Sequence, residues 1–317
     1  MVRHKGLFVP APLSKGDKIG IISLSGYDAE EVMGAMSVIA SNGFVPVLSD
    51  AIQNSLSESG LIPRGDRIIG VYSMLEDPEI KAIFCCGDGS GSVELLPNFS
   101  YGPIAKNPKW LVGKEAVTAF LSMWVISDIA AINGPMCSDL ISEGPWVKAL
   151  FNLLTAGGSF DYTLPSSPEN RAGKISGRII GGNLSMITLL NGTPYDLLSR
   201  NLNNHLGDKG VILFLEDANI SFGKVRDMLL RFYLTGDLQL VNGLIFGSFR
   251  NCKSYEHLHS IKDVVKELEE RWMIPPGIPI VYDFPIGEGT ENLPLTECIE
   301  AELEVTADLV TLRSLKS

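Results

Sequence analysis

The sequence predicts an α/β protein of two domains, a first domain built on a parallel sheet and a second domain of mixed strands and helices. Its 317 residues exceed the usual size of one domain and suit two. Apolar runs of strand length alternate with helical patterns in the first half, which indicates a parallel sheet covered by helices on both faces. Near the end, residues 300–312 alternate apolar and polar side chains, which is typical of strands with one face in water.

The first domain is expected to comprise residues 1–158. Its first helix is marked at both ends, because Asp28 can cap it and Asn42 with Gly43 can end it. The apolar side chains between these residues recur with the 3.6-residue period of a helix. The expected strands are residues 19–24, 44–48, 80–86 and 110–112, and the further expected helices are residues 64–75, 116–126 and 138–154.

The domain boundary is predicted at residues 159–170, which we expect to form a linker. This tract follows Gly157 and Gly158 and contains Pro165 and Pro168 among serines, a composition typical of turns. The second domain would then span residues 171–317. Its expected strands are residues 173–182, 211–215, 244–249 and 278–282 with those of the segment 300–312, and its expected helices are residues 183–190 and 222–234.

The chain is acidic, with 26 basic and 37 acidic residues and a formal net charge of −11. This charge repels nucleic-acid phosphates and anionic membrane surfaces, so we expect neither nucleic acid nor a membrane as a partner. No apolar run of signal-peptide length precedes Pro10, and the most apolar later stretch, residues 116–132, contains Asp128 and is too short to span a membrane. The five cysteines show no pairing framework and no metal-finger spacing. We therefore expect a cytoplasmic protein with reduced cysteines.

A glycine-rich loop follows the third predicted strand and has the sequence Gly87-Asp88-Gly89-Ser90-Gly91-Ser92. Glycines let main-chain amides approach a ligand closely, and a helix that begins beside them favours an anion or an oxyanion. The same glycines could also serve only a tight turn between strand and helix. A phosphate loop is not favoured, because no Gly-Lys-Ser or Gly-Lys-Thr follows.

A second connection between a strand and a helix lies at residues 108–120. The short apolar strand 110–112 meets Gly113, and an apolar helix begins at Ala116. Such a turn holds one side chain at the carboxyl edge of a parallel sheet, with the helix amides behind it. The side chain held there is Glu115, at a place where a serine would indicate acyl transfer.

Short motifs follow one another in a fixed order along nearly the whole chain. They include Gly16-Asp17-Lys18-Ile19-Gly20-Ile21, Pro108-Lys109-Trp110-Leu111-Val112-Gly113, Asn133-Gly134-Pro135-Met136, Gly181-Gly182-Asn183-Leu184 and Leu213-Phe214-Leu215-Glu216-Asp217. Their order and spacing resemble the LD-carboxypeptidase family of serine peptidases, which includes murein tetrapeptide carboxypeptidases and microcin C immunity peptidases. The resemblance implies an N-terminal Rossmann-like domain, a mixed β/α C-terminal domain and a homodimer. It also implies a Ser-Glu-His triad that releases a terminal D-amino acid from muropeptides.

All three triad positions of the family carry a glutamate in this chain. The family nucleophile lies in the motif Gly-aromatic-Ser-Asp, and residues 113–116 place Glu115 in the serine position. The family glutamate falls on Glu216, and the histidine of the family motif Pro-x-Gly-His falls on Glu288. By the same resemblance, the oxyanion or ligand-binding positions are Gly89, Ser90, Gly91 and Ala116. Asp88 replaces the first glycine of the family loop, and Asn133 replaces a family histidine.

Serine-peptidase chemistry needs a hydroxyl nucleophile and a base that later protonates the leaving amine. Glu115 has no hydroxyl, and no histidine stands at position 288. Ser90 and Ser92 are nearby hydroxyls, but either would still need a base. The histidines lie outside the matched motif, so we expect a surface or structural role for His4, His205, His257 and His259.

Three carboxylates brought together would repel one another, and the sequence leaves several resolutions open. One carboxylate could hold a proton with a raised pKa. A divalent cation such as Mg²⁺, Mn²⁺ or Ca²⁺ could bind, or Lys114 could turn inward and pair with a carboxylate. Alternatively, the three positions have drifted apart into solvent after activity was lost.

These residues support three hypotheses about function. The first is a pseudoenzyme of the family that binds a small peptide or a muropeptide without cleaving it. The second is an enzyme of different chemistry, in which Glu115, Glu216 and Glu288 act as acid and base or hold a divalent metal. The third is an active carboxypeptidase with an unrecognised nucleophile. The resemblance implies no cofactor. Under the second hypothesis, a divalent metal could be bound by the three glutamates.

Overall fold

The computed structural model describes residues 6–54, 60–142, 144–199, 210–289 and 292–315. The chain divides into two compact units, each with its own sheet and core. The first unit comprises residues 1–158 and 292–296, and the second comprises residues 159–291 and 297–317. The fold is the two-domain α/β arrangement that the sequence predicts.

The first unit contains a six-stranded sheet whose strand order is β13-β7-β6-β5-β1-β3. β1 pairs parallel with β3 and β5, and β6 pairs parallel with β5 and β7, as alternating strands and helices predict. The strands are β1 (Lys18–Ser23), β3 (Val45–Leu48), β5 (Ile80–Cys86), β6 (Trp110–Gly113), β7 (Ala131–Asn133) and β13 (Leu295–Glu297). A separate pair is formed by β2 (Gly26–Tyr27) and β4 (Gly60–Leu61).

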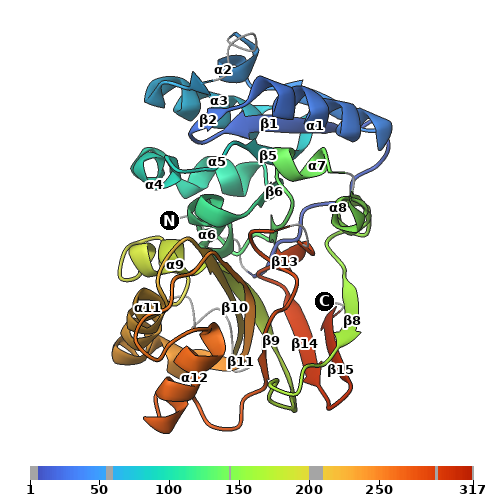
Figure 1. The fold of residues 1–317 in the computed structure, drawn as a ribbon. Coiled ribbons are helices and arrows are strands. Elements are labelled where there is room, and N and C mark those ends of the chain that lie inside the picture. The colour runs from blue at the N-terminus through green and yellow to red at the C-terminus, as the bar shows by residue number, and fades with distance from the viewer. Residues whose placement is uncertain (1–5, 55–59, 143, 200–209, 290–291, 316–317) are drawn as a thin grey trace. The chain divides into compact units, whose positions relative to one another are not determined.

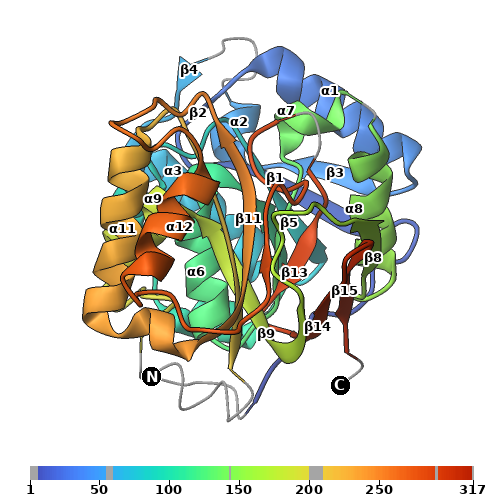
Figure 2. The ribbon, with the colours of Figure 1, turned by 60° about the horizontal axis from the view of Figure 1, so that its bottom comes forward.

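Helices cover both faces of this sheet, with α1, α7 and α8 on one side and α3 and α6 on the other (Figure 2). Asp28 caps α1 as predicted, because its carboxylate accepts the amide hydrogens of Glu30 and Glu31. The helices are α1 (Ala29–Ser41), α2 (Asp50–Gln53), α3 (Arg64–Glu76), α4 (Ser92–Leu95), α5 (Tyr101–Lys106), α6 (Thr118–Ile126), α7 (Cys137–Leu140) and α8 (Pro145–Thr155). Two 3-10 turns are η1 (Leu96–Asn98) and η2 (Glu115–Val117).

The second unit contains a seven-stranded sheet of order β12-β11-β10-β9-β14-β15-β8. The strands from β9 to β12 are parallel, whereas β14, β15 and β8 join antiparallel. The strands are β8 (Asp161–Pro165), β9 (Gly173–Asn183), β10 (Val211–Ala218), β11 (Val241–Arg250), β12 (Ile280–Val281), β14 (Glu300–Val305) and β15 (Leu309–Ser314).

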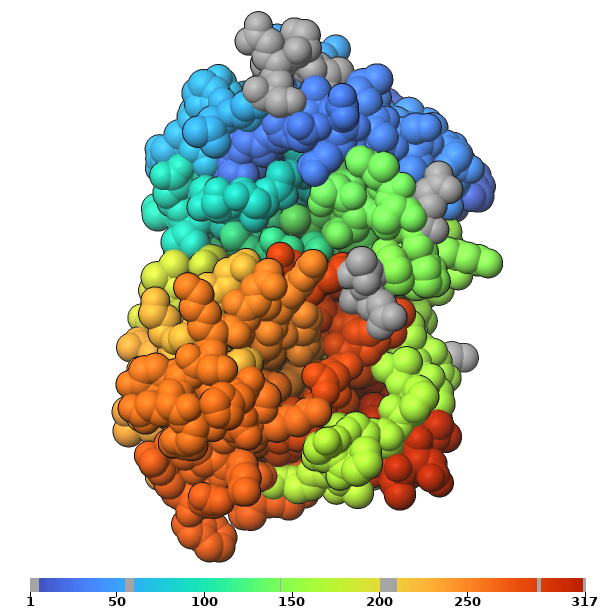
Figure 3. Space-filling view, viewed as in Figure 1, coloured from blue at the N-terminus to red at the C-terminus, as the bar shows by residue number. Residues whose placement is uncertain are grey.

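The helices of the second unit lie beside the parallel half of its sheet (Figures 1 and 2). They are α9 (Leu184–Leu190), α11 (Phe222–Thr235), α12 (Ile261–Glu270) and the 3-10 turn η4 (Asp237–Leu240). In the space-filling view, the orange residues that include α12 form one continuous face of this unit, and the red C-terminal strands also reach the surface (Figure 3).

Three local expectations differ from the structure. Residues 159–170, expected to be a linker, contain β8, whose partner is the distant strand β15. The helix expected at 138–154 is two helices, α7 and α8, because Pro145 lacks the amide hydrogen of a helix interior and starts a new helix instead. Of the strand expected at 278–282, only the two residues of β12 are assigned to a strand.

Within the described residues, no helix is long and apolar enough to cross a membrane.

Candidate functional site

The connection between β6 and α6 has the sharp form that the sequence predicts. Gly113 ends the strand, Lys114 is extended, and Glu115, the first residue of the 3-10 turn η2, adopts a φ of +53°. A positive φ is uncommon and strained for a residue with a side chain, and such strain is often found at functional positions. Glycine is required at 113, because a Cβ there would lie 2.8 Å from the Cβ of Val117. The family position of the nucleophile therefore has a turn that presents its side chain, although that side chain is a glutamate.

Lys114 is buried and forms the charge partner of Glu115. Its side chain is 4% exposed, and its Nζ lies 3.4 Å from the Glu115 carboxylate and 3.1 Å from Asp139 Oδ1. Burial lowers the pKa of Lys114, but the carboxylates of Asp139 and Glu115 outweigh this effect, and the pKa is raised overall. Asp139 is oriented in turn, because its Oδ2 accepts the amide hydrogen of Met136 at 2.8 Å. Of the resolutions left open by the sequence, the inward turn of Lys114 is the one observed at Glu115.

The glycine loop packs against this turn. Gly89 has a φ of +70°, and a Cβ there would lie 3.0 Å from the Val117 amide nitrogen, so the loop needs glycine both for its conformation and for its close approach. The hydroxyl of Ser92 donates to the carbonyl oxygen of Ala116 at 2.6 Å. The first unit thus brings together the predicted positions Gly89 and Ala116. The hydroxyl hydrogen of Ser92 is used in a hydrogen bond to the main chain.

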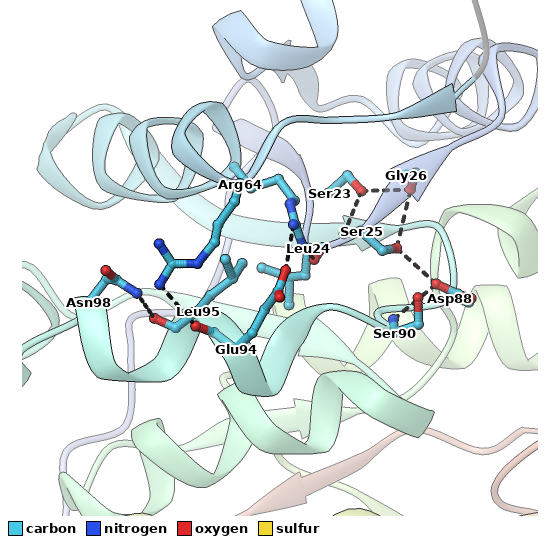
Figure 4. A network of polar contacts seen from close by, with 11 residues as sticks. Ser23, Leu24, Ser25, Gly26, Arg64, Asp88, Ser90, Glu94, Leu95 and Asn98 are labelled. Atoms are coloured by element: carbon cyan, nitrogen blue, oxygen red, sulfur yellow. Dashed lines mark hydrogen bonds and ion pairs between the residues drawn. The ribbon is translucent and has the colours of Figure 1, made fainter.

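Asp88 stabilises the same loop through its side chain (Figure 4). Its Oδ1 accepts the amide hydrogen of Ser90 at 2.9 Å and the hydroxyl hydrogen of Ser25 at 2.8 Å. Burial raises the pKa of Asp88, but these hydrogen bonds favour the carboxylate more strongly and hold the pKa below its ordinary value. The residue that replaces a family glycine therefore links the glycine loop to the turn after β1.

Asn133, at the end of β7, lies beside the strained turn. The strand register pairs Gly113 with Asn133, and the amide of Gly134 donates to the carbonyl oxygen of Gly113 at 3.0 Å. The Asn133 side chain is 1% exposed, and both of its amide atoms lack a hydrogen-bond partner among the described residues. An asparagine amide in this state offers both a donor and an acceptor at the place of a family histidine.

In the second unit, Glu216 and the segment that carries Glu288 lie together. Glu216 belongs to β10, is 1% exposed, and is paired in register with Asn183 of β9. Gly287 has a φ of +101°, and a Cβ at this position would lie 2.7 Å from the Cβ of Glu216. Only glycine therefore allows the chain before Glu288 to pass so close to the buried glutamate.

Glu288 itself is half-buried and lines a cavity of about 360 Å³ within the second unit. Arg250, at the end of β11, and Asp283 contribute further charges to the lining. The lining therefore combines one cationic and two anionic side chains with the apolar side chains of Phe284, Pro285 and Ile286. Sequence reasoning missed Arg250 and Asp139, because neither lies in a motif that matched the family.

The two histidines in the described part of the chain, His257 and His259, lie close together in the second unit. His257 Nε2 lies 3.0 Å from Glu267 Oε2, and the His259 amide donates to Asp263, so both imidazoles belong to the segment that leads into α12. His4 and His205 lie outside the described residues. Within the part of the chain that the structure describes, no group of three or more histidine, cysteine, aspartate or glutamate side chains could hold a metal ion.

Comparison with known proteins identifies the family. The model of the LD-carboxypeptidase N-terminal domain matches residues 19–134, and that of the C-terminal domain matches residues 176–303. The chain is 29% identical over 303 residues to the probable murein peptide carboxypeptidase of Bacillus subtilis (strain 168), which covers 91% of this chain and 90% of that protein. It is 26% identical over 341 residues to the microcin C7 self-immunity protein MccF of Escherichia coli, with coverage of 90% and 95%.

Solved structures share the fold. The muramoyltetrapeptide carboxypeptidase from Oxalobacter formigenes superposes with a TM-score of 0.80 at 23% identity, over 94% of this chain and 99% of that chain. MccF in complex with glutamyl sulfamoyl guanosine superposes with a TM-score of 0.77 at 20% identity, over 97% and 98%. Since the two domain models together match most of its length, the chain belongs to the LD-carboxypeptidase family.

Proposed function

We propose that this protein is a non-catalytic member of its family that binds a small peptide or a muropeptide fragment. The observation that carries the proposal is the ion pair at the strained turn, where Glu115 takes the nucleophile position and faces the buried ammonium of Lys114. A carboxylate in this position has no hydroxyl to form an acyl-enzyme, and the histidine position holds Glu288.

The binding role is supported by what the two units retain. Glycines at 89 and 287 still allow the close approaches described above, and the strained φ of Glu115 persists. Strained backbone is maintained only where the surrounding structure holds it in place. A cavity with mixed charge at Glu288 suits the carboxylate and amide groups of a peptide. One relative, MccF, has been solved with an aminoacyl sulfamoyl nucleoside, which is also a small amino-acid derivative.

The proposal includes no metal and no cofactor. The charge on Glu115 is balanced by Lys114, so this carboxylate does not need a cation to be stable where it lies. A homodimer and a cytoplasmic location remain part of the proposal. The homodimer rests on the family resemblance, and the cytoplasmic location rests on the cysteine pattern and the short apolar runs of the sequence.

The test is mass spectrometry of a murein tetrapeptide incubated with the purified protein, with and without Mg²⁺, Mn²⁺ or Ca²⁺, combined with calorimetric titration of the same peptide. We expect binding heat and no released D-alanine in any condition. Release without metal would refute the pseudoenzyme proposal in favour of an unrecognised nucleophile, and release only with metal would refute it in favour of carboxylate-metal chemistry. Absence of both binding and release would refute the peptide-binding role.

A further inference from the structure

A cavity of about 720 Å³ lies in the first unit between the start of α3 and the glycine loop. Its polar lining comes from Ser25, Arg64, Arg67, Ser90 and Glu94. Figure 4 shows the polar contacts that surround it, with Arg64 and Glu94 on one side and the linked side chains of Ser25, Asp88 and Ser90 on the other. None of the three glutamates at the family triad positions lines it.

The cavity lies where the topology of the sheet favours a ligand. In the strand order β13-β7-β6-β5-β1-β3, the chain leaves β1 toward β3 on one side, while β5 and its successors lie on the other side. The residues after β1 and after β5 supply Ser25, Ser90 and Gly91 to the lining. In open α/β sheets, ligands bind in the crevice beyond the carboxyl ends of two such strands.

Arg67 is built into the wall of this cavity. Its side chain is 10% exposed, its Nη1 donates to the carbonyl oxygen of Leu24 at 2.8 Å, and its Nη2 lies 2.6 Å from the Glu94 carboxylate. Its Nε is buried and has no hydrogen-bond partner among the described residues. A guanidinium carries five donors, so the Nη1 and Nη2 groups of Arg67, which lines the cavity, each keep one hydrogen beyond those given to Leu24 and Glu94.

Gly91 allows Arg67 to occupy this position. A Cβ at residue 91 would collide with the Arg67 guanidinium and would lie 2.8 Å from the carbonyl oxygen of Leu24. A larger residue would therefore displace the arginine from the glycine loop. The glycine loop thus makes two close contacts: Gly89 packs against the strained turn, and Gly91 packs against Arg67.

Arg64 adds an accessible cation at the first position of α3. Its side chain is exposed, and its Nη2 donates to the carbonyl oxygen of Glu94 at 3.2 Å, which uses one of the five donors of a guanidinium. The helix it opens is 13 residues long, and Pro63 at the cap position offers no side-chain hydrogen bond to the first amides. Free amides and the positive end of the helix dipole both favour an anion at this place.

Two acidic groups beside the cavity are already neutralised or hydrogen-bonded, and Asp66, in the first turn of α3, does not line it. Glu94 is paired with Arg67, and Asp88 accepts hydrogen bonds from Ser25 and Ser90. The lining therefore carries two arginines against one glutamate. Its apolar part is formed by Leu61, Ile62, Pro63 and Val93.

We propose that this cavity binds the oxyanion of a small molecule, a carboxylate or a phosphate, whose apolar part lies against the aliphatic side of the lining. The oxyanion would accept hydrogen bonds from the guanidinium groups of Arg64 and Arg67, and the Ser90 hydroxyl lies in the same wall. The cavity shares Ser90 and Gly91 with the ligand-binding positions that the family resemblance implies. Because none of Glu115, Glu216 and Glu288 lines it, the inference does not depend on the proposed peptide binding.

The test uses phenyl phosphate and phenylacetate, which share an apolar ring and differ in the oxyanion, with benzyl alcohol as the neutral control. Calorimetric titration gives the affinity, and amide chemical shifts locate the site. The variants are Arg64→Gln, which changes an exposed side chain, and Arg226→Gln as the control of equal charge change in the second unit. Gly91→Ala, with its fold checked by circular dichroism, tests the position of Arg67 separately.

We expect at least one anion to bind the wild-type chain and the Arg226→Gln variant alike, to shift the amides of Ser90 and Gly91, and to bind Arg64→Gln about tenfold or more weakly. Preference for phenyl phosphate would assign a phosphate ligand, and preference for phenylacetate would assign a carboxylate. The proposal would be overturned if neither anion bound up to a concentration of about 10 mM. It would also be overturned if Arg64→Gln and Arg226→Gln bound the anion with equal affinity, or if benzyl alcohol bound as tightly as the anions.

Discussion

The ion pair between Lys114 and Asp139 can be tested by a double-mutant cycle. Asp139→Asn leaves the buried ammonium with Glu115 as its remaining carboxylate, 3.4 Å away and 31% exposed. Removing one partner of a fully buried pair costs about 3–5 kcal/mol, and the partial exposure of Asp139 and the remaining Glu115 reduce this to about 2–3 kcal/mol. Lys114→Met removes the buried charge and keeps an unbranched apolar side chain, so we expect a loss of only about 1 kcal/mol.

The double variant Lys114→Met/Asp139→Asn should be about as stable as Lys114→Met alone, because the aspartate has no ammonium left to neutralise. The coupling energy would then be about 2 kcal/mol. Urea unfolding followed by tryptophan fluorescence suits this measurement, because Trp110, Trp124 and Trp146 lie in the first unit and Trp272 of the second unit is already 81% exposed. Stability changes that add within about 0.5 kcal/mol would refute the pairing.

The same ion pair predicts a dependence on alkaline pH. The pKa of Lys114 is raised above its ordinary value of 10.5, so the folded state holds this proton more tightly than the unfolded state does. The stabilisation is fully present below pH 10.5 and is lost as the pH rises through the higher folded value. We expect the wild-type chain to lose more stability than Lys114→Met over this range. An equal loss in both proteins would contradict a buried ammonium at position 114.

Three further predictions follow from other residues. Burial raises the pKa of Glu297 from 4.5 to about 8. The stability of the wild-type chain should therefore fall by roughly a few kcal/mol as the pH rises from 4.5 to 8. Urea unfolding of Glu297→Gln should show no such pH dependence, and an unchanged dependence would argue against the buried acid. Glu115→Ser alone should release no D-alanine from a murein tetrapeptide by mass spectrometry, because position 288 still lacks an imidazole. Measurable release by that single variant would disprove this account of the site. Gly89→Ala should lower the free energy of unfolding by about 2–4 kcal/mol, because residue 89 has a positive φ and contacts the turn at Val117. Gly102→Ala in α5 should be neutral or stabilising. Similar urea midpoints for the two variants would show that Gly89 is not required for its conformation and close contact.

The elements defined by local pattern were predictable from the sequence. The helix expected at 64–75 is α3, the strand expected at 80–86 is β5, and the Asp28 cap is present, because periodicity and caps depend on neighbours in the chain. β8 and β13 were not predicted, because β8 lies in a tract whose prolines and serines indicate turns and β13 is only three residues long. The break between α7 and α8 did have a signal, Gly144 followed by Pro145, and it was overlooked.

The candidate site was predictable in its backbone and less so in its charge partners. The strand, turn and helix around Glu115 follow from residues 110–126 alone. The pairing of Lys114 with Glu115 was one of several options, because the sequence does not say which way a lysine turns. Its other partner, Asp139, lies 25 residues further along the chain, and only the fold brings the two side chains together. The arginine wall at Arg67 depends on tertiary contacts in the same way.

The surroundings of Glu115 and Glu216 argue against drift into open solvent after loss of activity. A glutamate released from selection for a fixed place would be expected on a hydrated surface, with a relaxed backbone and without a buried cation beside it. Instead, Glu115 keeps a φ of +53° next to a lysine side chain that is 4% exposed, and Glu216 is 1% exposed under a glycine that could not be replaced without a clash. Burying the Lys114 ammonium is costly unless its carboxylate partners are in place, so Lys114, Glu115 and Asp139 form a set whose members stabilise one another. The mutual stabilisation of these three side chains supports the proposed binding role.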